Sequence, residues 1–159
     1  MDDAKASAIQ GYNESYPTRQ VFMTELDTSA MAHDLAHAAL AKLARDVRLI
    51  DLRGVVSYTD YFVVCSGQNP RQTQAIAEHV MDVMKEKGYH RPRRKESDPE
   101  GTWLLLDYVD VVLHIFTPES RAFYRLESLW GQVPQSTIED PVGADSEVPG
   151  ESTPQHAGS

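Results

Sequence analysis

Apolar residues recur at helical spacing in the stretch that begins near residue 29. Thr28 or Ser29 can accept a hydrogen bond from the first free backbone N–H groups, so either can cap a helix there. The apolar side chains that follow share one helical face: Met31, Leu35, Ala39 and Leu43. The pattern predicts a first amphipathic helix that covers a core.

Two extended stretches follow this helix. Residues 48–53 alternate around an apolar centre and stop at Gly54. Residues 60–66 are almost continuously apolar, which is typical of a strand covered on both faces. Cys65 lies in the second stretch, and a cysteine in an apolar strand is usually a small core residue rather than a nucleophile.

A second helix is marked by its end signals. Asn69 can cap it, Pro70 suits its first position, and Gly88 follows its last turn near Lys87. Its apolar face is formed by Ile76, Val80, Val83 and Met84. This segment predicts a helix that crosses over one face of the sheet.

Residues 102–108 and 110–116 then form two predicted strands. The gap between them is so short that a tight hairpin is expected. Thr117 and Pro118 open a third helix that ends at Gly131. Its expected inner face consists of Phe123, Leu126, Leu129 and Trp130.

The predicted element order is α-β-β-α-β-β-α. This order indicates an α/β (α+β) fold with a small mixed sheet of about four to five strands flanked by helices. Residues 29–133 would form the folded domain. Residues 1–28 show no sustained period, and residues 134–159 are rich in Pro, Gly and acidic residues, so both ends are expected to be disordered.

Charge and composition narrow the function classes. The net charge of the 159-residue chain is −9, which argues against a protein that wraps nucleic acid, but the acidity lies mainly in the two ends. The folded middle is nearly balanced, so a ribosomal partner remains open. One cysteine, no membrane-length apolar run and no signal peptide predict a cytoplasmic protein.

Two groups of side chains resemble metal sites. His33 and His37 share a helical face, but the intervening residue that would act as base is Asp34, and a third ligand is missing. Asp107 and Asp110 could hold Mg²⁺ as in nucleotidyltransferases, which is the alternative function; their simpler role is to shape the hairpin turn. We therefore expect no catalytic residues, no metal and no cofactor.

Two further features suggest binding. The basic segment 85–95 could contact RNA phosphates, although a solvated loop is an equal alternative. On a strand Trp103, Leu105 and Asp107 point to one face, so they either pack under a helix or form a docking patch. The sequence leaves core and interface open for Trp103.

Several motifs together resemble the RsfS/Iojap family of ribosomal silencing factors. In its first half the similarity is carried by residues 51–54 (Asp-Leu-Arg-Gly), 59–64 (Thr-Asp-Tyr-Phe-Val-Val), 66–67 (Ser-Gly), 71–72 (Arg-Gln) and 75–77 (Ala-Ile-Ala). In its second half it is carried by residues 101–103, 105–108, 110–116, Arg121, Tyr124, 126–127 and 129–130. The similarity covers about residues 33–133, and all its parts stand in the family's order.

The resemblance implies a nucleotidyltransferase-like topology without the catalytic equipment. It also implies binding to ribosomal protein fourteen of the large subunit, steric exclusion of the small subunit, repression of translation when nutrients are short, and a homodimer when free. The partner-binding residues that it indicates are Trp103, Leu105, Asp107, Tyr108, Asp110, Arg71 and Gln72.

Two positions depart from the family pattern. Val109 stands where family members usually have Gly in the hairpin turn, and a β-branched residue is costly there if the turn needs a positive φ. Asn69-Pro70 replaces the usual residues ahead of Arg71-Gln72 but should still start a helix.

Overall fold

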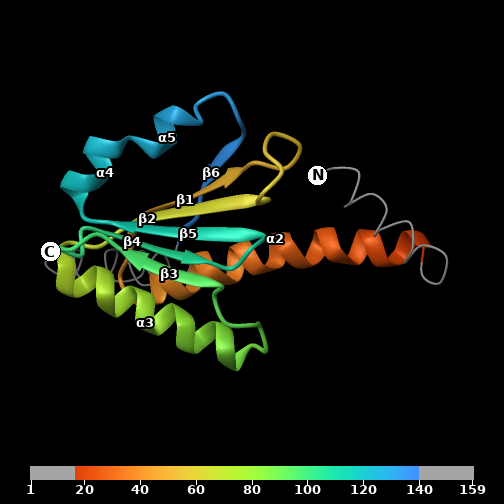
Figure 1. Cartoon of the computed structure of the whole chain (residues 1–159), viewed down its shortest axis with the longest axis horizontal. Coiled ribbons are helices and arrows are strands. Elements are labelled where there is room, and N and C mark those ends of the chain that lie inside the picture. Colours follow the sequence, from red (N-terminus) through yellow and green to blue (C-terminus); the bar gives the residue numbers. More distant parts are fainter. Residues whose placement is uncertain (1–16, 140–159) are drawn as a thin grey trace, which may run out of the picture.

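The structure, a computed structural model, describes residues 17–139 (Figure 1). Its elements in chain order are α2 (Pro17–Ala41), β1 (Arg45–Asp51), β2 (Tyr61–Ser66), α3 (Pro70–Glu86), β3 (Arg94–Ser97), β4 (Trp103–Asp107), β5 (Val111–Phe116), α4 (Pro118–Tyr124), α5 (Leu126–Leu129) and β6 (Gln135–Thr137). The mixed α+β class predicted from the sequence is confirmed.

The strands form one sheet in the order β3-β4-β5-β2-β1-β6. Among the described strands only β2 and β5 pair in parallel, and the other neighbours are antiparallel. The sheet has six strands, two more than the four that the hydrophobic pattern marks. The missed strands are β3, whose four residues are all exposed, and the three-residue β6. Neither buries an apolar side of its own, so neither leaves a period in the sequence.

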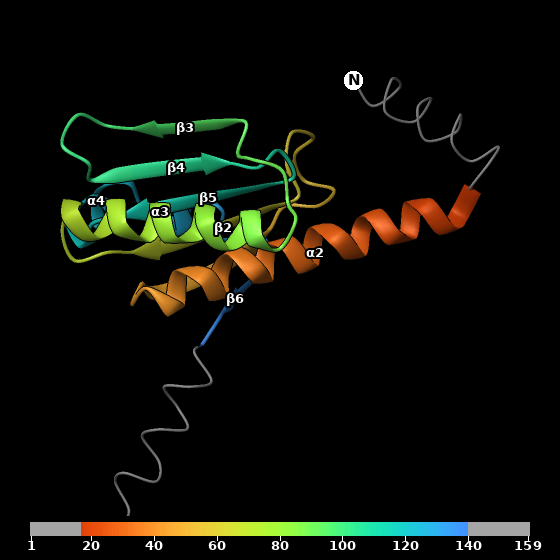
Figure 2. The same cartoon turned by 90° about the horizontal axis from the view of Figure 1, so that it is seen from below.

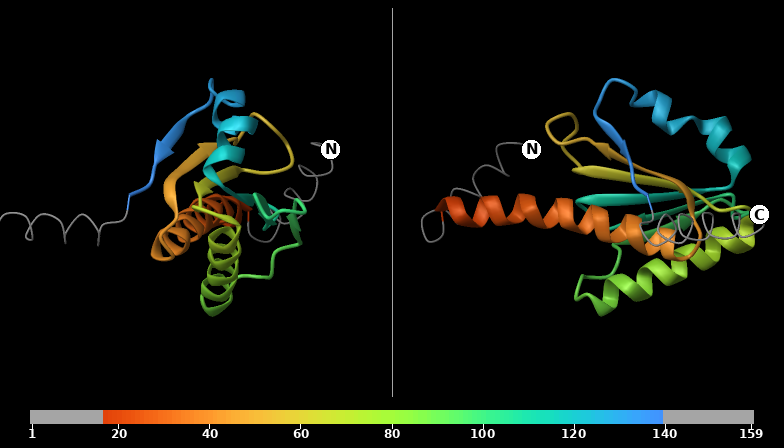
Figure 3. Two further views of the ribbon diagram at one scale, coloured as in Figure 1. Left: turned by 90° about the vertical axis from the view of Figure 1, so that its left-hand side faces the viewer. Right: turned by 180° about the vertical axis from the view of Figure 1, so that it is seen from behind.

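The two faces of the sheet are covered unequally. Helices α2 and α3 lie side by side across one face, which we call the closed face, and α4 and α5 stand over part of the other (Figures 1 and 3). Figure 2 views the molecule from the side of α2 and α3 and shows both helices in front of the sheet. Alternate residues of β2, β4 and β5 enter two separate apolar clusters, one per face. The sheet therefore has a fully packed side and a partly open side.

The second helix and the hairpin match their sequence predictions. Asn69 accepts a hydrogen bond from the Gln72 amide at 2.9 Å, Pro70 starts α3, and Lys87 caps its end. The predicted inner face of α3 is buried except for Val83, which is half-buried. Strands β4 and β5 pair antiparallel across the predicted tight turn.

Both predicted domain ends need correction. The first helix begins at Pro17 rather than near Ser29, and Leu43 lies beyond its end with 75% of its surface exposed. Residues 135–137, expected in the disordered tail, pair with β1 as β6. Residues 1–16 and 140–159 lie outside the described residues.

The third helix is interrupted. Arg125 adopts a left-handed backbone with φ +50°, which ends α4 and starts the short α5. The break turns Phe123 and Leu129 outward, with 76% and 71% of their surfaces exposed. Leu126 and Trp130 do pack against the sheet. The expectation of one inner face for four residues is wrong because it assumed an unbroken helix.

Candidate docking surface

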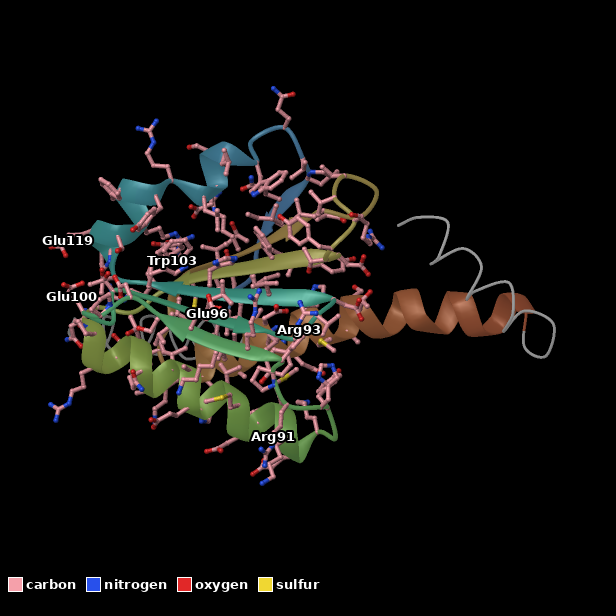
Figure 4. The ribbon with its side chains drawn as sticks, in the orientation of Figure 1. Arg91, Arg93, Glu96, Glu100, Trp103 and Glu119 are labelled. Atoms are coloured by element: carbon pink, nitrogen blue, oxygen red, sulfur yellow. The ribbon has the colours of Figure 1, made fainter. Side chains whose placement is uncertain are left out.

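Part of the second sheet face is not covered by α4 and α5, and we call this part the open face. It carries a shallow pocket of about 280 Å³. It is lined by Tyr58, Phe62, Arg93, Arg94, Leu105, Asp107, Val112 and His114. Trp103 borders it, lying between the sheet and α4, while Arg93 and Glu96 lie on the side of β3 (Figure 4). Apolar floor and charged rim are the usual composition of a protein-docking patch.

Trp103 is held in place rather than free. Its ring stacks on Phe116 with centroids 5.2 Å apart and touches Tyr124 of α4 at 4.5 Å. Its indole Nε1–H donates to Nδ1 of His114 at 3.2 Å. The side chain remains partly exposed. Trp103 is thus both a core contact and part of the surface, which answers the alternative that the sequence left open.

His114 is a polar residue in the middle of β5 that sequence reasoning did not select. Only 4% of its surface is exposed, and burial lowers the pKa of its imidazole to about 4. The ring is therefore neutral at pH 7, and because Nδ1 accepts from Trp103, the proton is on Nε2. That Nε2–H has no hydrogen-bond partner among the described residues. The signal that could have revealed it is a single polar side chain within an otherwise apolar strand.

Asp107 forms the charged part of the open face. Its Oδ2 accepts hydrogen bonds from Arg93 at 3.0 Å and from Arg94 at 3.4 Å. Burial would raise the pKa of this carboxyl, but the bonds from Arg93, the Val109 amide and Arg94 outweigh it and lower the pKa. The carboxylate oxygens of Asp107 therefore already accept hydrogen bonds from two guanidinium groups and one backbone amide. These positively charged and N–H donor groups do not favour Mg²⁺ binding at the same oxygens.

The hairpin turn joins Asp107 to the strained Val109. Val109 has φ +77°, a left-handed conformation that is unfavourable for a β-branched residue. Asp107 Oδ1 accepts a hydrogen bond from the Val109 amide at 2.8 Å and holds the turn. The predicted turn-shaping role of Asp107 is confirmed. The turn does require a positive φ at residue 109, which is the condition under which a β-branched residue is costly.

Tyr108 is not on the open face. Its side chain is fully buried in the cluster of the closed face, where burial raises the pKa of its phenol to about 12. Side chains along β4 point alternately to the two faces of the sheet, and this alternation continues to residue 108. Asp107 and Tyr108 therefore point to opposite sides. The expectation that Tyr108 is an accessible anchor is therefore wrong for this structure.

Three other predicted site residues lie elsewhere. The Asp110 carbonyl accepts hydrogen bonds from the Asp60 amide and the Thr59 hydroxyl, which ties the hairpin to the start of β2. Arg71 and Gln72 belong to the first turn of α3, on the closed-face layer. Gln72 Nε2 donates to the backbone of the α2 end, so it joins the two helices. These residues are not brought together with Trp103.

The remaining candidates give no built metal site. Across residues 17–139, no three His, Cys, Asp or Glu side chains gather closely enough to hold a metal ion. His33 instead contacts the Ser29 carbonyl through Nδ1 at 2.9 Å. Cys65 is buried in the core as predicted, and burial raises its thiol pKa to about 12. No helix in this part of the chain is both long and apolar enough to span a lipid bilayer.

The fold and its half-covered sheet define a small α+β domain, and similarity to known proteins identifies its family. The family model described as ribosomal silencing factor during starvation (RsfS) matches residues 25–159. The chain belongs to the RsfS family. This is the family that the sequence motifs indicated.

Individual relatives agree. Ribosomal silencing factor RsfS of Bacillus subtilis is 37% identical over 98 residues, which cover 62% of this chain and 82% of that protein. The chloroplastic protein Iojap of Zea mays is 36% identical over 102 residues, which cover 64% of this chain and 44% of that protein. A crystal structure of a protein from Chromobacterium violaceum superposes with a TM-score of 0.59 at 29% identity, covering 72% of this chain and 92% of that one.

Proposed function

We propose that this protein docks on the large ribosomal subunit through its open face and thereby keeps the small subunit from joining. The partner is expected to be ribosomal protein fourteen of the large subunit. The observation that carries the proposal is the half-covered sheet face, where Trp103 and Leu105 remain partly exposed beside a pocket. Family membership supports the ribosomal target.

The chemistry of the open face suits a protein partner. Leu105 and Val112 supply apolar contact area, and Tyr58 stands at the pocket with 60% of its surface exposed. Arg93 and Arg94 are tied to Asp107 but are themselves largely exposed, so they can also meet carboxylates of a partner. His114 contributes a neutral, buried ring to the floor of the pocket. This mechanism is steric, so it needs no acid, base or metal.

We also propose that segment 85–95 touches neighbouring rRNA. Lys85 and Arg91 line a second pocket of about 350 Å³ near the end of α3, and neither forms an ion pair within the described residues. Figure 4 shows Arg91 at the far end of α3 from Trp103. Unpaired cations on the last turn of α3 and on the segment after it suit phosphate contacts. Replacing Arg91 with Gln should weaken ribosome binding modestly and reduce its salt dependence.

Co-sedimentation with purified large subunits tests the docking surface. Leu105→Asp places a charge at the centre of the open face without entering the closed-face core, so binding should fall at least tenfold. Leu43→Asp is the matched control, because Leu43 is exposed just beyond the end of α2 and does not line the open face. Trp103→Ala should also abolish co-sedimentation, and circular dichroism must show that both open-face variants remain folded.

A subunit-joining assay tests the consequence of docking. Saturating protein should reduce the light-scattering signal of reassociating subunits, and Leu105→Asp should restore it. Normal joining in the presence of bound wild-type protein would refute steric exclusion.

The free protein is further proposed to be a homodimer. Exposed apolar side chains such as Phe123 and Leu129 support self-association. Light scattering of the purified chain should give about twice the monomer mass of 17.8 kDa. A monomer mass at high micromolar concentration would exclude it.

A further inference from the structure

A larger cleft lies away from the open face. It has a volume of about 490 Å³ and shares no lining residue with the open face. Its lining residues come from the end of β2, the start of β1 and the segment α4–α5. Figures 1 and 3 show that this segment rises from the end of β5. The carboxyl ends of β2 and β5 therefore meet at this cleft, and such strand ends are a common place for ligands in sheets with parallel strands.

Three arginines line the cleft. Arg121 is largely buried and rigidly held, because its Nη1 donates to the Ser66 hydroxyl at 2.8 Å and its guanidinium pairs with Glu127. Arg45 and Arg125 are exposed, and neither forms an ion pair or hydrogen bond through its side chain within the described residues. The Glu127 charge is balanced by Arg121, so the remaining charges of the cleft are the two positive charges of Arg45 and Arg125 and the negative charge of Asp46.

The backbone has unusual conformations at two positions that line the cleft. The register of β1 against β2 is irregular between Arg45 and Arg48, and Asp46 there has φ +49°. Arg125 has φ +50° at the break between α4 and α5. Two unfavourable backbone conformations thus border the same cleft, as is common where side chains are aimed at a site.

We propose that this cleft binds a phosphate-bearing ligand of nucleotide size. Guanidinium groups match phosphate oxygens through paired hydrogen bonds, and the cleft volume lies in the range of small-molecule sites. The lining contains no aromatic ring on which a base could stack. Recognition therefore falls on the phosphate groups and shows little preference among bases.

The cleft differs from a phosphate-binding loop. The Gln68 amide already donates to the Gln72 side chain at 2.8 Å, and Pro70 has no N–H to offer. Binding must therefore come from arginine side chains, which makes it sensitive to single charge changes. Asp46 opposes the ligand, because its carboxylate lines the same cleft.

Isothermal titration with inorganic diphosphate, ADP, GDP and a 5′-phosphorylated RNA hexamer tests the proposal on the full chain. The double variant Arg45→Gln/Arg125→Gln should weaken binding at least tenfold, and Asp46→Asn should tighten it about threefold. The control Lys42→Gln/Arg48→Gln removes two exposed charges that lie outside both the cleft and segment 85–95, and it should bind as wild type. ADP and GDP should bind within about threefold of each other.

The probes separate two sources of the phosphate. Tighter binding of the hexamer than of ADP, lost without its 5′-phosphate, would identify an RNA end; equal or weaker binding would identify a free nucleotide. Absence of binding by all four probes at millimolar concentration, or unchanged binding by the double variant, would overturn the proposal. Co-sedimentation with large subunits is measured separately, so failure here leaves the docking surface untouched.

Discussion

The two faces of the sheet are made from the same strands but differ in how far helices cover them and in which side chains they bury. On the closed face, α2 and α3 bury an almost wholly apolar cluster that includes Leu104, Leu106 and Ile115. On the other face, short α4 and α5 cover only part of the strands, and Asp107 and His114 are buried beside apolar groups. The closed face is packed almost wholly by apolar groups, whereas the partly covered face also buries polar groups beside its exposed apolar side chains.

This contrast explains why a single strand carries both roles. Neighbouring residues of β4 point to opposite sides of the sheet. Along its five residues, side chains that pack in the closed-face core therefore alternate with side chains that face the proposed docking surface. A polar group buried without a partner costs free energy, and the Nε2–H of His114 has none within the described residues. The protein tolerates this cost on the face that we propose for docking.

The largest expected effect comes from comparing Leu106→Ala with Leu105→Ala. Leu106 is fully buried on the closed face, so its truncation should lower the free energy of unfolding by about 3 kcal/mol. Leu105 is half-buried on the open face, so its truncation should cost about 1 kcal/mol or less. Urea denaturation measures both. Equal losses would mean that the two faces do not differ as described.

The second test uses pH. The folded-state pKa of His114 is lowered to about 4, so between pH 6.5 and 4 the unfolded chain binds a proton that the folded chain does not. Stability should therefore fall as the pH drops through this window, by about 1.4 kcal/mol per unit at most. His114→Gln, which can still accept from Trp103, should flatten the decline. An unchanged pH slope in that variant would assign the decline to other groups.

A smaller loss is expected for Asp107→Asn. Asn keeps an oxygen for the Val109 amide but loses the charge that pairs with Arg93 and Arg94. Because both arginines are largely exposed, we expect a loss of about 1 kcal/mol at pH 7. The folded-state pKa of Asp107 is lowered, so its contribution is present above pH 3.8 and disappears as the pH falls through the folded value. Thermal unfolding at pH 7 and pH 2.5 should show a smaller difference between variant and wild type at pH 2.5 than at pH 7.

The smallest effect concerns the turn that joins β4 to β5. Val109→Gly should relieve the strain of φ +77° and raise stability by about 0.5 kcal/mol, since the gain exceeds the entropy that glycine adds to the unfolded chain. Val109→Ala is the control, because it keeps a Cβ at the same φ and should give little gain. Destabilisation by glycine in urea denaturation would show that the valine side chain contributes packing that outweighs its strain.

The sequence by itself determined the elements that have local signals. Asn69 and Pro70 fixed the start of α3 through capping, and the apolar runs fixed β2, β4 and β5. The order of the motifs also identified the family. These features could be predicted because a cap or an amphipathic period depends on residues close together in the chain.

Only the tertiary structure decided what lies on which side and how far it is covered. The left-handed Arg125 splits the last helix, so α4 and α5 leave the open face uncovered. The register of β4 against β5 placed His114 beside Trp103, and packing in the closed-face cluster buried Tyr108. The exposed β3 and β6 exist only because a neighbouring strand offers unpaired backbone groups. Such outcomes depend on contacts across the fold, and no local pattern records them.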